Sequence, residues 1–195
     1  MNRLAALVIV DCQNDFIDPK GALYIPGAER IKDALVNTIK QQDRYFDWII
    51  LTQDWHSKED YAQREESKMF PEHCIKGTWG AQIIDEVELA LQDPSIDAVE
   101  LRYTKPVFDI WAESPDFISA VKRNLEPQDT IYVCGVATNY CVYQAIKGFI
   151  EAGFEDVVLL TGAVKGIPDG TYEPRMVELK KMGVKFVENI EDGEV

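Results

Sequence analysis

Gly135-Val136-Ala137-Thr138-Asn139-Tyr140-Cys141-Val142 is the stretch that decides the fold of this 195-residue chain. It follows an apolar run, Thr130 to Cys134, that predicts a buried strand, and its small residues predict a turn into a helix. Cys141 would then lie in the first turn of that helix. Free N–H groups and the helix dipole stabilise a thiolate there and could hold an oxyanion, so we expect Cys141 to be a nucleophile with a lowered pKa.

Two charged residues follow other predicted strands. Asp11 closes the continuous apolar run Leu4 to Val10, and Lys105 lies just past the shorter run Ala98 to Leu101. A carboxylate can take the thiol proton and later deliver it to a leaving group, while an ammonium favours the charged forms of Asp and Cys. Because open α/β sheets bind ligands at the carboxyl ends of parallel strands, we expect Asp11, Lys105 and Cys141 to share one site.

Strands and helices alternate along the chain. Further apolar runs predict strands at 48–51, 156–160 and 184–187, and apolar residues at helical spacing predict five helices between the strands. This order predicts an α/β fold, a three-layer αβα sandwich with a six-stranded parallel sheet. The length and the hydrophobic content of 46% fit a single domain over residues 1–195.

Composition excludes several classes of partner. The net charge of −14 disfavours binding to nucleic acid or to an anionic membrane. No apolar stretch approaches the roughly 20 residues that span a bilayer. The four cysteines fit reduced thiols in a cytoplasmic protein better than two disulfides.

A second group of polar residues lies in a predicted loop or insertion at about 53–80, which has little periodicity. Both histidines of the chain, His56 and His73, are in it. Asp54 is two residues before His56, which places both side chains on one face of an extended segment. With His73 they offer three N/O ligands and leave room for water or substrate, as in a catalytic or substrate-binding metal site. Zinc is our first choice, with iron and manganese open.

Five segments, taken in chain order, resemble a known family. They are Val8-Ile9-Val10-Asp11-Cys12-Gln13-Asn14-Asp15-Phe16, Leu51-Thr52-Gln53-Asp54-Trp55-His56, the run from Phe70 to Ala81, Lys105, and Gly135 to Val142. Together they resemble the isochorismatase-like superfamily of cysteine hydrolases, and most of all its nicotinamidase branch. The resemblance covers nearly the whole chain and implies the isochorismatase-like hydrolase fold.

The resemblance assigns roles to the strand-end residues. It implies that Asp11, Lys105 and Cys141 are a catalytic triad. It also implies a cis peptide bond between Val136 and Ala137, which turns the Ala137 N–H, with that of Cys141, toward an oxyanion.

The resemblance also supports a metal site at Asp54, His56 and His73. Members of the branch often have a fourth ligand between the two histidines, and Glu66 is its best replacement here, with Glu65 and Asp60 as alternatives. The implied activity is hydrolysis of nicotinamide to nicotinate and ammonia through a thioester on Cys141. Such proteins are often homo-oligomers, and a small-molecule amide is the expected partner.

Three aromatic residues are candidates for substrate binding. Phe16 and Phe70 match positions where the family places aromatic groups around the ring, although an ordinary core role is an equal alternative. We expect Tyr140, next to Cys141, to contact the substrate as well.

Other interpretations remain open at this point. The segment Val107-Phe108-Asp109-Ile110-Trp111 stands where many nicotinamidases have a Ser/Tyr-rich pocket segment, which leaves room for a related hydrolase acting on another small amide or carbamoyl compound. A non-enzymatic α/β signalling or binding domain is a third reading. Such a domain has no use for Cys141 at a helix start.

Overall fold

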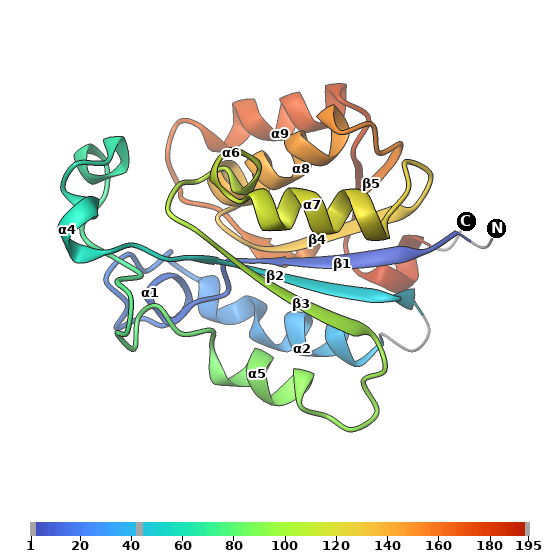
Figure 1. The fold of residues 1–195 in the computed structure, drawn as a ribbon, viewed down its shortest axis with the longest axis horizontal. Helices are drawn as coiled ribbons and strands as arrows, with labels where there is room; N and C mark the ends of the chain where they lie inside the picture. The colour runs from blue at the N-terminus through green and yellow to red at the C-terminus, as the bar shows by residue number, and fades with distance from the viewer. Residues whose placement is uncertain (1–2, 42–44, 194–195) are drawn as a thin grey trace.

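The computed structural model describes residues 3–41 and 45–193 and is built around one parallel sheet (Figure 1). Its six strands lie in the order β3-β2-β1-β4-β5-β6. In chain order they are β1 (Ala5–Val10), β2 (Trp48–Asp54), β3 (Val99–Lys105), β4 (Thr130–Val136), β5 (Asp156–Lys165) and β6 (Lys185–Val187). The α/β fold with a six-stranded parallel sheet, predicted from the sequence, is confirmed.

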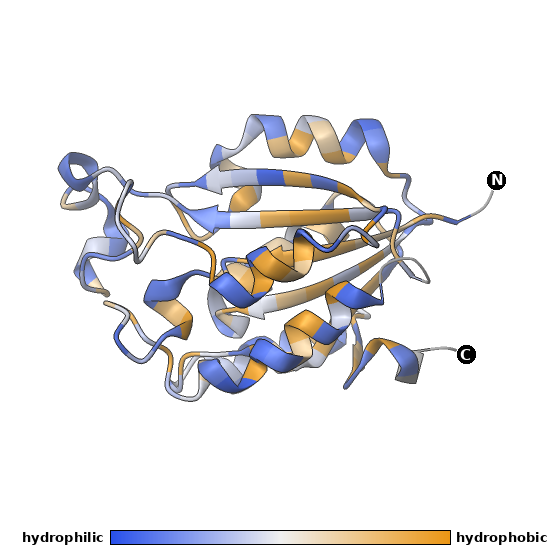
Figure 2. Cartoon of the chain, turned by 90° about the horizontal axis from the view of Figure 1, so that it is seen from below, coloured by the Kyte–Doolittle hydropathy of each residue, from blue (hydrophilic) through white to orange (hydrophobic). Residues whose placement is uncertain are grey.

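Helices cover both faces of the sheet. One face carries α2 (Lys32–Lys40) and α5 (Asp85–Leu91), and the other carries α7 (Pro115–Asn124), α8 (Tyr143–Glu151) and α9 (Tyr172–Lys181). Short helices lie in the connections: α1 (Asn14–Ile17), α4 (Lys58–Tyr61) and α6 (Ile110–Glu113). The central strands are hydrophobic over most of their length (Figure 2) because both of their faces are buried.

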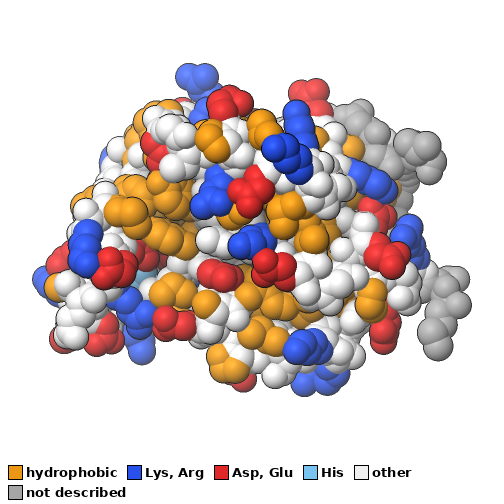
Figure 3. Space-filling view, turned by 90° about the horizontal axis from the view of Figure 1, so that it is seen from above, with side chains coloured by type: hydrophobic (Ala, Val, Ile, Leu, Met, Phe, Trp, Pro, Cys, Tyr) orange, Lys and Arg blue, Asp and Glu red, His pale blue; other side chains and the backbone are white. Residues whose placement is uncertain are grey.

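The surface differs from this interior. On the face formed by α7, α8 and α9, positive and negative side chains are interspersed (Figure 3). Among the described residues, no helix is both long enough and apolar enough to cross a membrane. None of the four cysteines forms a disulfide.

The strands extend further than the apolar runs suggested. β2 continues through Asp54 and β3 through Lys105, and these two residues are register partners. The prediction of a loop from residue 53 is therefore wrong at its start, and the loop itself contains α4 and a 3-10 turn at Glu65–Lys68. The backbone ladder continues past the last apolar side chain because its hydrogen bonds do not depend on side-chain polarity. As a result the backbones of Asp54 and Lys105 are fixed by the hydrogen bonds of the sheet and not by a loop.

The order in which strands are added to the sheet changes side between β1 and β4. The chain adds β2 and β3 on one side of β1 and then crosses over to add β4 on the other side, parallel to β1. Gly135 of β4 pairs with Val10 of β1 and has a φ of +105°. A Cβ atom there would lie 2.1 Å from the Val10 carbonyl oxygen. Only glycine therefore lets the two strands come this close at the point where Asp11 and the Cys141 turn leave the sheet.

Aromatic rings fill the space between β3, α7 and α8. The Phe149 ring lies 5.0 Å from that of Trp111 and 6.0 Å from that of Phe117, measured between centroids. The Trp111 Nε1–H donates to the Ala145 carbonyl at 3.1 Å. Trp111, from the segment that departs from the family pattern, is thus a partly buried residue that packs against the core and contacts α8.

We predict that Phe149→Ala lowers the free energy of unfolding by about 3–5 kcal/mol, because it empties a fully buried aromatic site. Urea unfolding followed by circular dichroism measures the change. Leu89→Ala is the control, since Leu89 is 67% exposed on α5, and its effect should stay within about 0.5 kcal/mol. Equal effects of the two substitutions would contradict this account of the core.

Candidate active site

Four strand ends meet at the carboxyl edge of the sheet. Asp11 follows β1, Asp54 ends β2, Lys105 ends β3, and Cys141 lies in the turn after β4. All four side chains are buried. The structure therefore brings together the three triad residues predicted from the sequence, and adds Asp54 to them.

Lys105 is the centre of this group. Its Nζ lies 2.7 Å from Asp11 Oδ2 and 3.3 Å from Cys141 Sγ, and it donates a hydrogen bond to Asp54 Oδ1. Burial opposes its charge, but the two carboxylates raise the pKa of Lys105 well above its ordinary value. Lys105 is therefore a permanent cation between two carboxylates.

Cys141 differs from the sequence prediction in two ways. It lies in a π-helical turn, Thr138–Val142, and α8 begins only at Tyr143. Burial raises the pKa of the Cys141 thiol well above its ordinary value, and Lys105 only partly offsets this. The expectation of a lowered pKa is wrong because Cys141 is 5% exposed and also faces the negative charges of Asp11 and Asp54.

The Cys141 side chain is thus a thiol that would need a base to ionise. One carboxylate oxygen of Asp11 lies within 4.8 Å of Cys141 Sγ. Burial raises the pKa of Asp11, with Lys105 opposing the shift, and the Thr52 hydroxyl donates to Asp11 Oδ1 at 2.7 Å. A carboxylate with a raised pKa is a better proton acceptor, and Asp11 is the carboxylate of this kind beside the Cys141 thiol.

The peptide bond between Val136 and Ala137 is cis. The Ala137 carbonyl accepts hydrogen bonds from the N–H groups of Tyr140 (2.9 Å) and Val142 (3.2 Å), which turns the backbone sharply before Cys141. Ala137 and Cys141 line the same small cavity, which we call the catalytic cavity.

A second cluster adjoins the first. Asp54, His56, Glu66 and His73 each offer a ligand atom, and these atoms lie within 4.8 Å of one another. His73 Nε2 is 3.7 Å from Asp54 Oδ2 and 3.3 Å from Glu66 Oε1. His56 Nε2 is 3.8 Å from Glu66 Oε2. The structure therefore brings together all four predicted metal ligands.

The chemistry of this cluster fits a divalent cation. Its facing polar atoms are buried and have no hydrogen-bond partner among the described residues: Asp54 Oδ2, His56 Nε2, both Glu66 oxygens and His73 Nε2. Burial lowers the pKa of His73, but the nearby carboxylates of Asp54 and Glu66 outweigh this and raise it to about 10. Two carboxylates and two imidazoles around one point are a mixed N/O donor set that a divalent metal satisfies.

Of the three acidic residues considered for the fourth ligand position, only Glu66 reaches the cluster. Glu66 is 5% exposed. The Glu65 side chain is 84% exposed and pairs with Lys68, and Asp60 is exposed as well. The 3-10 turn at Glu65–Lys68 turns these neighbours in opposite directions.

Aromatic side chains enclose the catalytic cavity. Phe16, Phe70, Phe108 and Tyr140 line it together with Cys141. The Phe16 ring lies 5.3 Å from the His73 ring, and Phe70 makes edge contacts with Tyr140 and Phe108. The three predicted substrate-binding aromatics, Phe16, Phe70 and Tyr140, thus line the cavity beside Cys141, and Phe108 joins them from the segment that departs from the family pattern.

Several supporting residues were not singled out from the sequence. The Gln13 side chain donates to the Asp54 carbonyl and accepts from the Asp54 N–H, both at 2.8 Å. The Asp15 carboxylate accepts from the Cys74 N–H at 2.7 Å, next to His73. The Tyr61 hydroxyl lies 3.2 Å from His73 Nδ1 and 2.8 Å from the Pro71 carbonyl. Gln13 and Asp15 lie in the first family-like segment, which was the one signal available for them.

Comparison with known proteins gives a consistent set of relatives. Residues 5–191 match the model of the isochorismatase domain. The chain is 28% identical over 188 residues to a nicotinamidase of Saccharomyces cerevisiae, covering 80% of this chain and 86% of the relative. It is 26% identical over 204 residues to a nicotinamidase of Acinetobacter baylyi, covering 93% of this chain and 91% of the relative. A pyrazinamidase of Pyrococcus horikoshii, solved in complex with zinc, superposes with a TM-score of 0.75 at 32% identity. The superposition covers 94% of this chain and 98% of the pyrazinamidase.

We predict that Glu66→Gln weakens zinc binding at least about tenfold, because an amide oxygen replaces a charged ligand. Competition with a chromophoric chelator measures the affinity without reference to any activity. Glu65→Gln is the matched control, since it removes the same charge one residue away on an exposed side chain. If both variants bind zinc like the unchanged protein, Glu66 is not a ligand.

Proposed function

The chain belongs to the isochorismatase family, and on that premise we propose that it is a metal-dependent cysteine amidohydrolase, specifically a nicotinamidase. In this proposal it hydrolyses nicotinamide to nicotinate and ammonia. Cys141 is the nucleophile, Asp11 the general base and acid, and Lys105 the buried cation beside them. The nicotinamidases of Saccharomyces cerevisiae and Acinetobacter baylyi support this assignment.

One observation carries the proposal. Asp54 belongs to both clusters, because its Oδ1 accepts a hydrogen bond from Lys105 and its Oδ2 faces His73. The thiol and three of the candidate metal ligands, Asp54, Glu66 and His73, line one cavity. A substrate held at the metal ligands by one atom and attacked by Cys141 at another has to be small, which favours a single-ring carboxamide.

The first half of the reaction follows from this geometry. Asp11 takes the proton of the Cys141 thiol as the sulfur attacks the amide carbon, and Lys105 offsets the charge of the Asp11–Cys141 pair. The N–H groups of Ala137 and Cys141 are our candidates for holding the resulting oxyanion. Asp11 then returns the proton to the departing nitrogen, the C–N bond breaks, and ammonia and a thioester on Cys141 result.

The second half repeats these roles with water. Asp11 takes a proton from a water molecule that attacks the thioester carbonyl. The C–S bond breaks, the carboxylic acid product forms, and Cys141 recovers its proton.

Asp54, His56, Glu66 and His73 would hold the metal, for which we propose zinc. A divalent cation there would supply a Lewis acid for a ring nitrogen of the substrate. Phe16 and Phe70 would then hold the two faces or edges of the ring, and Tyr140 its outer side. In this proposal the metal ligands bind the ring of the substrate and Cys141 attacks its amide, which is why the two groups of residues are separate.

Cys141→Ala should abolish turnover of nicotinamide, because no other thiol lines the catalytic cavity. Cys134→Ala is the matched control: Cys134 is equally buried in β4, and its removal should leave turnover intact. Release of ammonia measures both rates. Activity retained in Cys141→Ala would exclude the proposed nucleophile.

Asp11→Asn should lower kcat by about 10²–10⁴, the contribution of general acid–base catalysis, because the amide keeps the shape but cannot accept the proton. Zinc affinity, measured in parallel, should be unchanged and so reports an intact site. A rise in KM alone would show that Asp11 serves binding and not proton transfer.

Benzamide separates this function from that of related hydrolases, because it has the same amide as nicotinamide but no ring nitrogen. We expect it to be a poor substrate, since a site built for a ligating nitrogen rejects an analogue that lacks it. Chelation, or His73→Ala, should raise KM for nicotinamide and change benzamide hydrolysis little. Equal cleavage of both amides by the zinc-loaded protein would instead favour a hydrolase of another small amide or carbamoyl compound.

A further inference from the structure

The catalytic cavity is closed in this structure. Its volume is about 20 Å³, which is room for about one water molecule. Cys141, at its base, is 5% exposed. No ring fits beside the thiol in this arrangement, so a side chain of the cavity wall has to move before any substrate reaches Cys141.

A larger cavity lies directly outside that wall. It has a volume of about 210 Å³ and is lined by Phe108, Asn139, Tyr140, Gln144, Thr171 and Arg175. We call it the outer cavity. Phe108 and Tyr140 line both cavities, so these two rings form the partition between them.

The partition is shut by ring contact. The centroids of Phe108 and Tyr140 are 5.3 Å apart, and that of Phe70 is 5.4 Å from Tyr140 and 6.0 Å from Phe108. Three rings at these distances are in van der Waals contact, which narrows the way to Cys141. Each ring contacts the other two, and Tyr140 makes the two shorter contacts, so its displacement opens the wall most.

A polar contact holds Tyr140 in place. Its hydroxyl donates to Asp169 Oδ2 at 2.7 Å. Burial opposes the charge of Asp169, but hydrogen bonds from Thr171, Tyr140 and Asn139 lower its pKa, so the acceptor is a carboxylate at neutral pH. The hydrogen bond is therefore charge-assisted.

The acceptor is fixed, which leaves the tyrosine as the movable partner. Asp169 Oδ1 accepts from the Thr171 N–H at 2.8 Å and from Asn139 Nδ2 at 3.1 Å. Asn139 also binds the backbone of Ile167, donating at 3.1 Å and accepting at 2.9 Å. The loop that carries Asp169 is thus tied to the turn that carries Cys141, and the Tyr140 hydroxyl is the contact that a side-chain rotation can break.

We propose that the amide substrate enters through the outer cavity, and that the hydrogen bond between Tyr140 and Asp169 is the latch that closes the passage to Cys141. The inference rests on the proposed function in so far as Cys141 is the group to be reached. When the latch opens, the Tyr140 ring turns away from Phe70 and Phe108 and the two cavities join.

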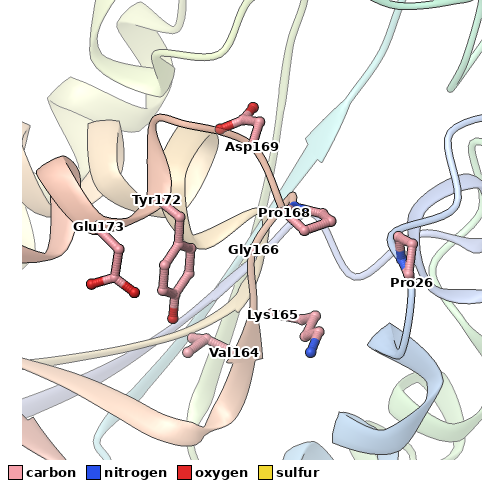
Figure 4. A pocket seen from close by; sticks show the side chains of 8 residues that line it. All are labelled: Pro26, Val164, Lys165, Gly166, Pro168, Asp169, Tyr172 and Glu173. Atoms are coloured by element: carbon pink, nitrogen blue, oxygen red, sulfur yellow. The ribbon is translucent and has the colours of Figure 1, made fainter.

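Two other hollows compete as entrances. One, of about 570 Å³, is lined by Pro26, Lys165, Tyr172, Glu173 and their neighbours (Figure 4). Asp169 lies at its rim, with its carboxylate turned away from Lys165. The other, of about 250 Å³, lies beside Trp55, His56 and Arg64. Neither shares a lining residue with the catalytic cavity, which favours the outer cavity as the route.

The first test is the rate at which Cys141 is modified in Tyr140→Phe, which keeps the ring and removes the latch. Two thiol reagents are compared, the small methyl methanethiosulfonate and the larger N-ethylmaleimide, with the modified cysteine identified by peptide mass. We expect the N-ethylmaleimide rate to rise about two- to tenfold, the effect of losing one hydrogen bond on the open population. It should rise more than the rate for the small reagent.

The comparison between reagents separates access from reactivity. A change in the reactivity of the thiol itself would alter both rates by the same factor, and that outcome overturns the latch. Tyr24→Phe is the matched control, because it removes another tyrosine–carboxylate hydrogen bond, to Glu29, outside both cavities. It should leave both rates unchanged.

The second test blocks the entrances one at a time. Gln144→Trp places a large ring in the outer cavity and should slow modification by N-ethylmaleimide several-fold, with a smaller effect on methyl methanethiosulfonate. Glu173→Trp fills the hollow of Figure 4 in the same way and should slow neither. A stronger effect of Glu173→Trp would overturn the proposed route.

Both tests are independent of nicotinamide turnover. If the protein does not hydrolyse nicotinamide, the rate at which N-ethylmaleimide modifies Cys141 should still change in Tyr140→Phe and in Gln144→Trp. Failure of the latch leaves nicotinamide hydrolysis in place with modification rates that do not respond to either substitution.

Discussion

The buried ammonium of Lys105 is the interaction on which the rest of this site depends. A charge at that depth is stable only with partners, and Lys105 has Asp11, Asp54 and the Cys141 thiol around its Nζ. Asp11 follows β1, Asp54 is the last residue of β2, and Cys141 lies in the turn after β4. One side chain, at the end of β3, therefore connects the ends of four strands. Removal of Lys105 would leave two carboxylates buried side by side without a counter-charge. The contacts that stabilise this edge of the sheet are therefore the same ones on which the proposed catalysis depends.

Asp54 extends this arrangement to a second charged cluster. One of its oxygens serves Lys105 and the other faces His73, so the position of the candidate metal ligands is set by the same carboxylate that helps hold the lysine. The Gln13 side chain forms hydrogen bonds with both the N–H and the carbonyl of the Asp54 backbone. With Glu66 included, the two adjoining clusters hold three carboxylates and one lysine. This excess of buried negative charge is what a divalent cation would offset.

Burial explains why the site is both reactive and closed. It raises the pKa of Cys141 and of Asp11, which keeps the thiol protonated at rest and makes the carboxylate a better base. The aromatic wall of Phe70, Phe108 and Tyr140 limits the cavity to about one water molecule, and this low water content strengthens the electrostatic contacts inside. The same wall blocks entry. In the proposed function the enclosed Cys141 needs a side chain of the wall to move, and we propose Tyr140, which one hydrogen bond to Asp169 holds in place.

The sequence by itself determined the alternation of strands and helices, the parallel sheet, and the strand-end positions of Asp11, Lys105 and Cys141, because apolar periodicity and chain order are local properties. It also indicated Asp54, His56 and His73 through spacing and family resemblance. Only the tertiary structure decided that Glu66 and not Glu65 reaches the cluster, since a 3-10 turn sets which neighbour points inward. It likewise reversed the expected pKa shift of Cys141, because desolvation depends on the atoms packed around the thiol and not on its place at a helix start.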